Sequence, residues 1–345
     1  FRVRSFLFQW PADLTTSWAF EMETIILGWY VLVETQSVFM LTVFASLLYL
    51  GTLLSPMIGV AGDRIGQGTL LCIMRSVYAL CALVLMTTAL LDILTPTIVL
   101  CTTLVVGLVR PSDIGIRRAL MAEIMPRDQL LGAIGIQRTT QDSARIAGAL
   151  SGAGLVAALG IGPAYVIVTL FYLVSILLML NAGDVRFRSL SAAPVRRAGK
   201  PAGGPPPASS AAGSSPWTAL KQGFSYVWYT PHLRAAMFIA LLLNCTAFPL
   251  SRDLLPVVAK DIYQSDQTTL GYMIAAIATG ALAGSLFISR FAHRVSPGRM
   301  MIVFSFAWCL MLAVFAYMPT PAIGIPVLLI TGIAQSFALI PGSAM

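Results

Sequence analysis

Charge is the scarcest feature of this 345-residue sequence. Charged residues make up 10% of it, against about 25% in an ordinary soluble domain. Hydrophobic residues reach 57%, and the mean hydropathy is +0.83. A soluble fold cannot hide that much apolar surface from water, so the shortage of charge excludes a water-soluble globular protein. The sequence predicts an all-α protein that crosses a lipid bilayer many times.

Side chains for metal, disulfide or nucleotide chemistry are also few. The five cysteines lie in apolar segments without a close pair, and the two histidines, His232 and His293, cannot form a metal centre without carboxylates. No phosphate-binding GxxxxGK[ST] loop occurs, which excludes an ATP-driven pump within this chain. The net charge of +8 forms no basic stripe. We predict no catalytic residue, no metal, no cofactor and no nucleic-acid partner.

Ten apolar runs are long enough to span a bilayer, which takes about 20 residues of helix. They cover residues 12–33, 38–60, 69–91, 95–115, 130–158, 161–182, 234–258, 268–289, 300–318 and 321–342. A polar stretch divides them, and its core at 198–215 contains only Gly, Pro, Ala and Ser besides one Lys, which is typical of a flexible linker. The sequence predicts a six-helix bundle over 1–183, a linker over 184–216 and a four-helix bundle over 232–345.

A short amphipathic segment follows the linker. Apolar side chains recur at helical spacing over residues 217–231, and Pro231 ends the pattern. The apolar face includes Trp217, Leu220, Phe224, Val227 and Trp228. This pattern predicts a helix that lies in the membrane interface.

Basic residues are distributed unevenly between the loops. Seventeen of the 22 lie at the N-terminus, in alternate loops or at adjoining helix ends, Arg75 and Arg117 among them. Only Arg252 and Lys260 fall on the opposite side. The positive-inside rule therefore predicts an inner-membrane protein whose N-terminus and central linker are cytoplasmic.

The loop between the second and third spans combines glycines with an acid-base pair. Gly59 and Gly62 lack a Cβ and permit another helix to approach closely. Asp63, beside Arg64, can pair with a cation or contact a helix N-terminus, and Gly66 permits a tight turn into the third span. These residues predict a gating contact; the alternative is an ordinary polar turn.

This loop resembles the G-x-x-x-D-R-x-G signature of the major facilitator superfamily, which stands at the same place between helices two and three. A degenerate copy follows the eighth span, offset by 230 residues: Ser289, Arg290, His293 and Arg294. His293 stands where the first copy has Asp63. The resemblance implies the major facilitator fold, with two pseudo-symmetric six-helix bundles that rock about a central site.

Shorter matches resemble the branch that contains enterobactin exporters and macrolide-efflux proteins. They include Thr35-Gln36-Ser37, Ala144-Arg145-Ile146 followed by Gly148 and Gly152, and Leu255-Pro256-Val257. We predict that Gly148 and Gly152 allow close helix packing. Exporters often carry a Gly-Pro pair in helix five, whereas Gly148 is followed by Ala149 here. The branch implies export of a drug or siderophore in exchange for protons.

The resemblance also sets an expectation about length. Members of the superfamily usually have twelve helices, whereas this sequence begins at Phe1 and ends at Met345, directly after the tenth predicted span. We expect a fragment that lacks helices eleven and twelve, so that the second bundle is truncated to four. Helix eleven is the expected partner of Gly59 and Asp63.

Two carboxylates, Glu21 and Glu23, lie near the middle of the first predicted span. An ionisable residue there costs about 2.5–3.5 kcal/mol, which makes each a functional candidate. The helical face of Glu21 is the more polar one, since it also bears Asp13, Ser17 and Thr24. We expect Glu21 to line a cavity and to be the better proton carrier, because no basic residue stands one turn away. Glu23 is the second candidate, and a structural hydrogen bond is the alternative for both.

Two acid-base pairs with i, i+3 spacing lie in the fourth and fifth spans. Arg110 and Asp113 form the first, and Asp142 and Arg145 the second. Such pairs can neutralise each other within a helix or pair across neighbouring helices. Their functional interpretation is a charged gate or a contact for an anionic substrate.

These features together favour a monomeric secondary transporter that works by alternating access. The expected partners are the lipid bilayer, a small-molecule substrate and protons. Proton-coupled export of a drug-like or siderophore-like molecule is the first hypothesis. The alternatives are uptake of another solute and a membrane scaffold without transport. The scarcity of histidine and the lack of a catalytic set argue against a membrane-embedded enzyme.

Overall fold

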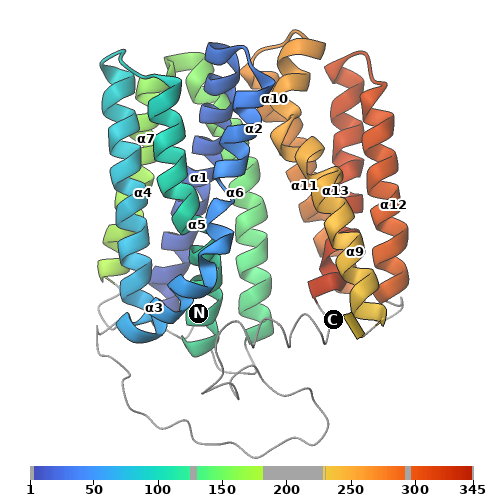
Figure 1. Cartoon of the computed structure of the whole chain (residues 1–345), viewed down its shortest axis with the longest axis horizontal. Coiled ribbons are helices and arrows are strands. Elements are labelled where there is room, and N and C mark those ends of the chain that lie inside the picture. Colours follow the sequence, from blue (N-terminus) through green and yellow to red (C-terminus); the bar gives the residue numbers. More distant parts are fainter. Residues whose placement is uncertain (1–3, 125–129, 182–227, 230, 292–296, 344–345) are drawn as a thin grey trace, which may run out of the picture.

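The computed structural model describes residues 4–124, 130–181, 228–229, 231–291 and 297–343, and this part of the chain is helical without strands. Figure 1 shows two helical bundles side by side, with the first half of the chain on the left and the second on the right. We call the lower end of the view the linker end, because α7 (Ile161–Asn181) ends there and α9 (Pro231–Cys245) begins there. The opposite end is called the far end.

The described helices follow the chain as ten passes along the bundle. The first half contains α1 (Arg4–Thr35), α2 (Val38–Leu47), the 3₁₀ turn η1 (Leu50–Leu53), α3 (Ser55–Ile65), α4 (Gln67–Leu90), α5 (Pro96–Ile124), α6 (Leu130–Leu159) and α7. The second half contains α9, the π-helical turn η3 (Pro249–Asp253), α10 (Leu255–Val257), the π-helical turn η4 (Val258–Ile262), α11 (Gln267–Phe291), α12 (Pro297–Ala316) and α13 (Pro321–Ser343). α2 to α3 and α9 to η4 each form one broken pass.

Apolar length identifies the membrane-crossing helices. Among the described residues, six single helices are long and apolar enough to span a bilayer, and the bent passage from α9 to η4 makes a seventh. α1 and α6 carry charged side chains along their middle, and α2 is separated from α3 by the turn η1. The passes outside this apolar set therefore carry charged side chains or a break along their own length.

Three predicted spans of the first half differ from the observed helices. α1 begins at Arg4, eight residues before the predicted start, and α5 runs on to Ile124 instead of ending at 115. The added turns carry polar side chains that pair inside the bundle, Trp10 with the Thr140 hydroxyl and Arg117 with Asp113, so the helices continue beyond their apolar stretches. The second span is broken by η1, where Gly51 and Gly107 let the turn contact the α5 backbone directly.

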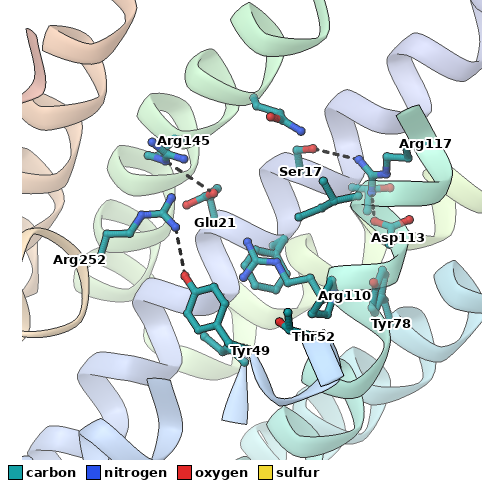
Figure 2. A pocket seen from close by; sticks show the side chains of 16 residues that line it. Ser17, Glu21, Tyr49, Thr52, Tyr78, Arg110, Asp113, Arg117, Arg145 and Arg252 are labelled. Atoms are coloured by element: carbon teal, nitrogen blue, oxygen red, sulfur yellow. Dashed lines mark hydrogen bonds and ion pairs between the residues drawn. The ribbon is translucent and has the colours of Figure 1, made fainter. Parts of the chain in front are cut away.

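The seventh span differs most from the uninterrupted helix predicted over 234–258. It is bent by 43° between its two parts, and both parts end in π-helical turns. Pro249 begins η3, and Pro256 lies in α10. Proline lacks a backbone donor and clashes with the preceding turn, which breaks a regular helix. The break directs Arg252 of η3 toward the first half (Figure 2).

Helix α1 forms the centre of the first half. Its buried side chains join a core to which α4 and α7 contribute Tyr78, Tyr165 and Tyr172. On another side it packs closely against α6: a Cβ at Gly148 would lie 2.7 Å from the Glu21 Cβ, and one at Gly152 would lie 3.1 Å from the Met22 Cα. The glycines therefore let the two helix backbones approach closely.

The two halves meet toward the far end. α6 packs against α11, where a Cβ at Gly271 would lie 2.7 Å from the Ala153 Cβ and 3.0 Å from the Ala149 carbonyl oxygen. At the end of η4, Lys260 Nζ donates to the Leu32 carbonyl oxygen at 3.0 Å and to Gln36 Oε1 at 2.7 Å. These contacts hold the halves together at the far end.

The close packing of α1 on α6 predicts different effects for two glycine substitutions in the same helix. Gly148→Ala places a methyl group against the Glu21 Cβ, and such overpacking costs about 1–3 kcal/mol. In Gly154→Ala the new methyl meets no described heavy atom within 4 Å, so only the helix-propensity gain of about 0.5–1 kcal/mol remains. We expect a lower melting temperature in detergent for the first variant and an equal or higher one for the second. Equal shifts in both variants would contradict the close contact.

Candidate functional site

A cavity of about 390 Å³ lies at mid-depth in the bundle. Most of its lining comes from the first half, from α1, the link between α2 and η1, η1 itself, α4, α5 and α6, and the second half contributes Arg252. The labelled polar lining in Figure 2 is Ser17, Glu21, Tyr49, Thr52, Tyr78, Arg110, Asp113, Arg117, Arg145 and Arg252. Four of these residues are arginines and two are carboxylates. The cavity is therefore more cationic than anionic.

A smaller cavity of about 70 Å³ shares part of this lining and extends into the second half. Its walls include Ile274 and Ile277 of α11, Gln335 of α13, and Asp253. Both cavities are lined by Glu21, Tyr49, Arg110, Arg145 and Arg252. These five residues stand where the two halves face each other.

Glu21 lines both cavities, from the α1 face that the sequence identified as the more polar one. Its Oε1 lies 3.8 Å from Arg145 Nε of α6, and Arg145 Nη1 lies 3.8 Å from Asp142 Oδ1. The expectation that Glu21 has no cation nearby is therefore wrong. The partner lies on a different helix, so the residue pattern of α1 alone does not indicate it.

Glu23 lies on the other side of α1, outside both cavities. It is 5% exposed, and its Oε2 accepts a hydrogen bond of 2.7 Å from the Tyr172 hydroxyl of α7. No ion pair of Glu23 occurs in the described part of the chain. Of the two candidate proton carriers, Glu23 is the one without a basic partner there.

Arg110 and Asp113 do not form the i, i+3 pair expected from the sequence. Asp113 Oδ2 instead lies 2.6 Å from Arg117 Nη2, one turn further along α5. The Arg110 guanidinium lies 3.0 Å above the ring of Phe20 of α1, a cation–π contact. Arg110 therefore faces the cavity over an aromatic ring and is not neutralised by its own helix (Figure 2).

A buried ionic cluster joins α1, α4 and α5 between the cavity and the linker end. Asp13 pairs with Arg75, which is 0% exposed, and its Oδ1 also lies 3.7 Å from Arg117 Nε. Arg117 in turn pairs with Asp113. Arg75 and Arg117 were predicted to be topology signals at helix ends, which is wrong because both side chains are buried inside the bundle. Their one available signal was the acid Asp13 at the matching depth of α1.

Tyr49 and Arg252 form a link between the halves that was not predicted from the sequence. Arg252 Nη1 donates to the Tyr49 hydroxyl oxygen at 3.3 Å, at the side of the cavity that faces the second half (Figure 2). Arg252 was assigned to the far side of the membrane, because the seventh span was taken as a regular helix. The sequence signal for the broken helix is the pair of prolines, Pro249 and Pro256. The π-helical turn beside them is a feature that is frequent at functional sites.

The glycine-acid loop lies at the linker end, between α3 and α4. Gly66 has φ +95°, a conformation that glycine adopts without steric cost, and it connects the two helices. A Cβ at Gly62 would lie 3.2 Å from Leu70 Cδ2, whereas one at Gly59 meets no described heavy atom within 4 Å. Asp63 and Arg64 belong to the last turn of α3, but their side chains lie outside the described part of the structure. The gating contact stays a prediction.

Other predicted features also lie outside the described residues. They are His293 and Arg294 of the second motif copy, the side chains of Ser289 and Arg290, the linker over 184–216, and the interfacial helix over 217–231 apart from positions 228, 229 and 231. Among the residues that the structure describes, no group of three or more His, Cys, Asp or Glu side chains could hold a metal ion.

The buried cluster predicts a severe effect for Asp13→Asn. The substitution leaves Arg75 buried without its carboxylate, and breaking a buried pair in this way costs about 3–5 kcal/mol. We expect a large drop in the melting temperature of the detergent-purified protein. Glu34→Gln, the same chemical change at an exposed position of α1, is the matched control.

Removing both charges tests the cause of that loss. The double variant Asp13→Asn/Arg75→Gln has no stranded cation, so we expect it to recover part of the stability. A double variant less stable than Asp13→Asn alone would show that the pair is not the source of the effect.

Comparison with known proteins places this arrangement among transporters. The sequence profile of the Major Facilitator Superfamily matches residues 13–345. The enterobactin exporter EntS of Escherichia coli O1:K1 is 29% identical over 117 residues, which cover 34% of this chain and 27% of the exporter. The same identity and coverage are found for EntS of Escherichia coli O127:H6.

Solved structures share the fold at low sequence identity. The nucleoside transporter NupG superposes with a TM-score of 0.66 at 16% identity, over 99% of this chain and 80% of that one. A bacterial homologue of the human lysosomal transporter Spinster gives a TM-score of 0.64 at 14% identity, over 100% and 75%. The D-xylose–proton symporter gives 0.64 at 12% identity, over 98% and 81%. With its helical halves, its central cavity and a family match across nearly all of its length, the chain belongs to the Major Facilitator Superfamily.

Proposed function

We propose that this protein is a secondary transporter that works by alternating access and exports a drug-like or siderophore-like molecule in exchange for protons. The observation that carries the proposal is the mid-depth cavity with charged walls from both halves. A site at such an interface changes its exposure when one half rocks against the other. Charged groups at this depth are costly, and they are characteristic of substrate and ion pathways.

The contacts between the halves support the rocking movement. The hydrogen bonds between the halves, within the described residues, involve only Arg252 and Lys260 on the second half. α6 meets α11 through small residues, Ala149, Ala153 and Gly271. Larger side chains join them, since Ile25 of α1 lies in one buried apolar cluster with Leu270 and Ile277 of α11. A rocking movement therefore needs a second arrangement of the halves that buries this surface again. The far-end contact is then the one that opens when the transporter changes state.

Proton coupling is proposed to use the carboxylates of α1, with Glu23 before Glu21. A proton on Glu23 removes a buried charge and strands no cation, since its described partner is the Tyr172 hydroxyl. A proton on Glu21 would instead weaken the contact with Arg145. Glu21 is therefore proposed to position Arg145 at the cavity wall.

The orientation is proposed from the distribution of basic residues. The linker end lies on the cytoplasmic side of the inner membrane, because the loops predicted for that side contain most of the basic residues. We expect green fluorescent protein fused after Gly203 to fluoresce and alkaline phosphatase fused at the same place to be inactive. Phosphatase activity at this position would overturn the orientation.

Export is favoured by the partial likeness to the enterobactin exporter EntS, which covers about a third of this chain. Uptake of another solute and a scaffold role without transport are the competing functions. The solved structures of similar fold include a nucleoside transporter and a sugar–proton symporter, so the fold by itself does not select a substrate.

The transport proposal predicts a gradient-dependent activity that depends on Glu23. We expect the protein in proteoliposomes with an imposed proton gradient to move solutes from a panel of antibiotics and siderophores, and an uncoupler to abolish the uphill movement. Glu23→Gln should lower uphill transport by at least about tenfold, because glutamine cannot exchange a proton. Solute binding in detergent should remain measurable.

The controls separate coupling from folding. Glu34→Gln, on the exposed side of α1, should transport at the wild-type rate. Normal uphill transport by Glu23→Gln would move the coupling site elsewhere, with Glu21 as the next residue to test. A wild-type protein that moves no solute, with or without a gradient, would favour the scaffold.

A further inference from the structure

Two cavity arginines form no ion pair within 4 Å with a carboxylate of the described residues. Arg110 of α5 lies over Phe20, and Arg252 of η3 binds the Tyr49 hydroxyl. The carboxylates of the large cavity are already engaged, Asp113 by Arg117 and Glu21 by Arg145. Asp253 follows Arg252 in the chain and lines the smaller cavity, but no ion pair within 4 Å joins them. The large cavity therefore has two cationic groups in excess.

The contacts of both arginines leave hydrogen-bond donors available. The ring of Phe20 covers one face of the Arg110 guanidinium, which leaves the N–H groups at its edge. Arg252 donates one of its five guanidinium N–H groups to the Tyr49 hydroxyl. A planar acidic group can accept two parallel hydrogen bonds from such an edge. An unpaired arginine at this depth is costly, and an anion that pairs with it lowers that cost.

The rest of the lining is suited to an organic molecule. Phe20, Tyr49 and Tyr78 provide aromatic surface, and Leu48 and Ile114 provide aliphatic surface. The volume of about 390 Å³ lies in the range of small-molecule sites and far exceeds that of a single inorganic ion. The cavity wall thus combines apolar surface with two cationic side chains, Arg110 and Arg252.

We propose that the cavity binds an organic anion with an aromatic body, whose acidic group lies between Arg110 of the first half and Arg252 of the second. The proposal rests on the proposed function only in that this anion is the transported solute. Because the two arginines belong to different halves, the ligand contacts both at once. Binding and the relative position of the halves are then linked through one acidic group.

A charge-matched pair of probes tests the proposal. Binding of radiolabelled 1-naphthoate and of 1-naphthamide to the protein in lipid nanodiscs is measured at pH 7, with empty nanodiscs subtracted. The two probes share their rings and differ in charge. We expect naphthoate to bind at least about tenfold more tightly than naphthamide, as hydrogen bonds to charged groups require.

Variants then locate the acidic group. Arg110→Gln and Arg252→Gln should each weaken naphthoate binding by about tenfold or more and leave naphthamide binding unchanged. Arg234→Gln removes the same charge at an exposed position of α9, and it should bind naphthoate as the wild type does. Gel filtration and melting temperature confirm that each variant is folded, and Arg110→Lys and Arg252→Lys, which keep the charge, should lose less affinity than the glutamine variants.

The outcomes separate this proposal from the transport function. Equal affinity for the two probes, unchanged binding in both arginine variants, or displacement of naphthoate by equimolar inorganic phosphate would each overturn the organic-anion site, even in a protein that transports a neutral solute. Charge-selective binding that depends on both arginines would support the site even in a protein that moves no solute. In that case the transport function alone would fail.

Discussion

A charge inside a bilayer has to find its counter-charge within the protein, and this requirement organises the first half of the chain. Asp13 pairs with Arg75, and Arg117 joins them to Asp113, so that one network connects α1, α4 and α5. Further along α1, Glu21 contacts Arg145 of α6 and Glu23 contacts Tyr172 of α7. These three acids of α1 thereby face different neighbouring helices. The central helix of the bundle is consequently the one with the most acids in its middle.

The pairing of these charges also explains why the cavity is more cationic than anionic. Acids and bases pair off toward the linker end and along α6, whereas Arg110 and Arg252 remain at the meeting of the two halves. Aromatic residues hold both arginines in place. The Phe20 ring lies under the Arg110 guanidinium, and the Tyr49 hydroxyl accepts a hydrogen bond from Arg252. The aromatic groups fix the position of the cations without neutralising them, which a carboxylate would have done.

Much of the architecture was predictable from apolar length, whereas the pairing of charges was not. The ten spans and the helical fold follow from runs of about 20 apolar residues, a property of each segment alone. The partner of Glu21 was missed because Arg145 belongs to another helix. Arg75 and Arg117 were misjudged because a buried arginine near a helix end has the same sequence pattern as one in a loop. The place of Arg252 depends on a π-helical turn, which hydrophobic periodicity does not reveal.

The composition of the contact between the halves has a consequence for the energy of any movement between them. Three hydrogen bonds cross it in the described residues, and each contributes on the order of 1 kcal/mol. The backbones of α6 and α11 approach closely, and Ile25 of α1 is buried in one apolar cluster with Leu270 and Ile277 of α11. Separating the halves there exposes this apolar surface to water, at a cost of about 25 cal/mol per Å². Any second arrangement of the halves therefore has to bury comparable apolar surface again, or bind a ligand whose binding energy offsets the exposure.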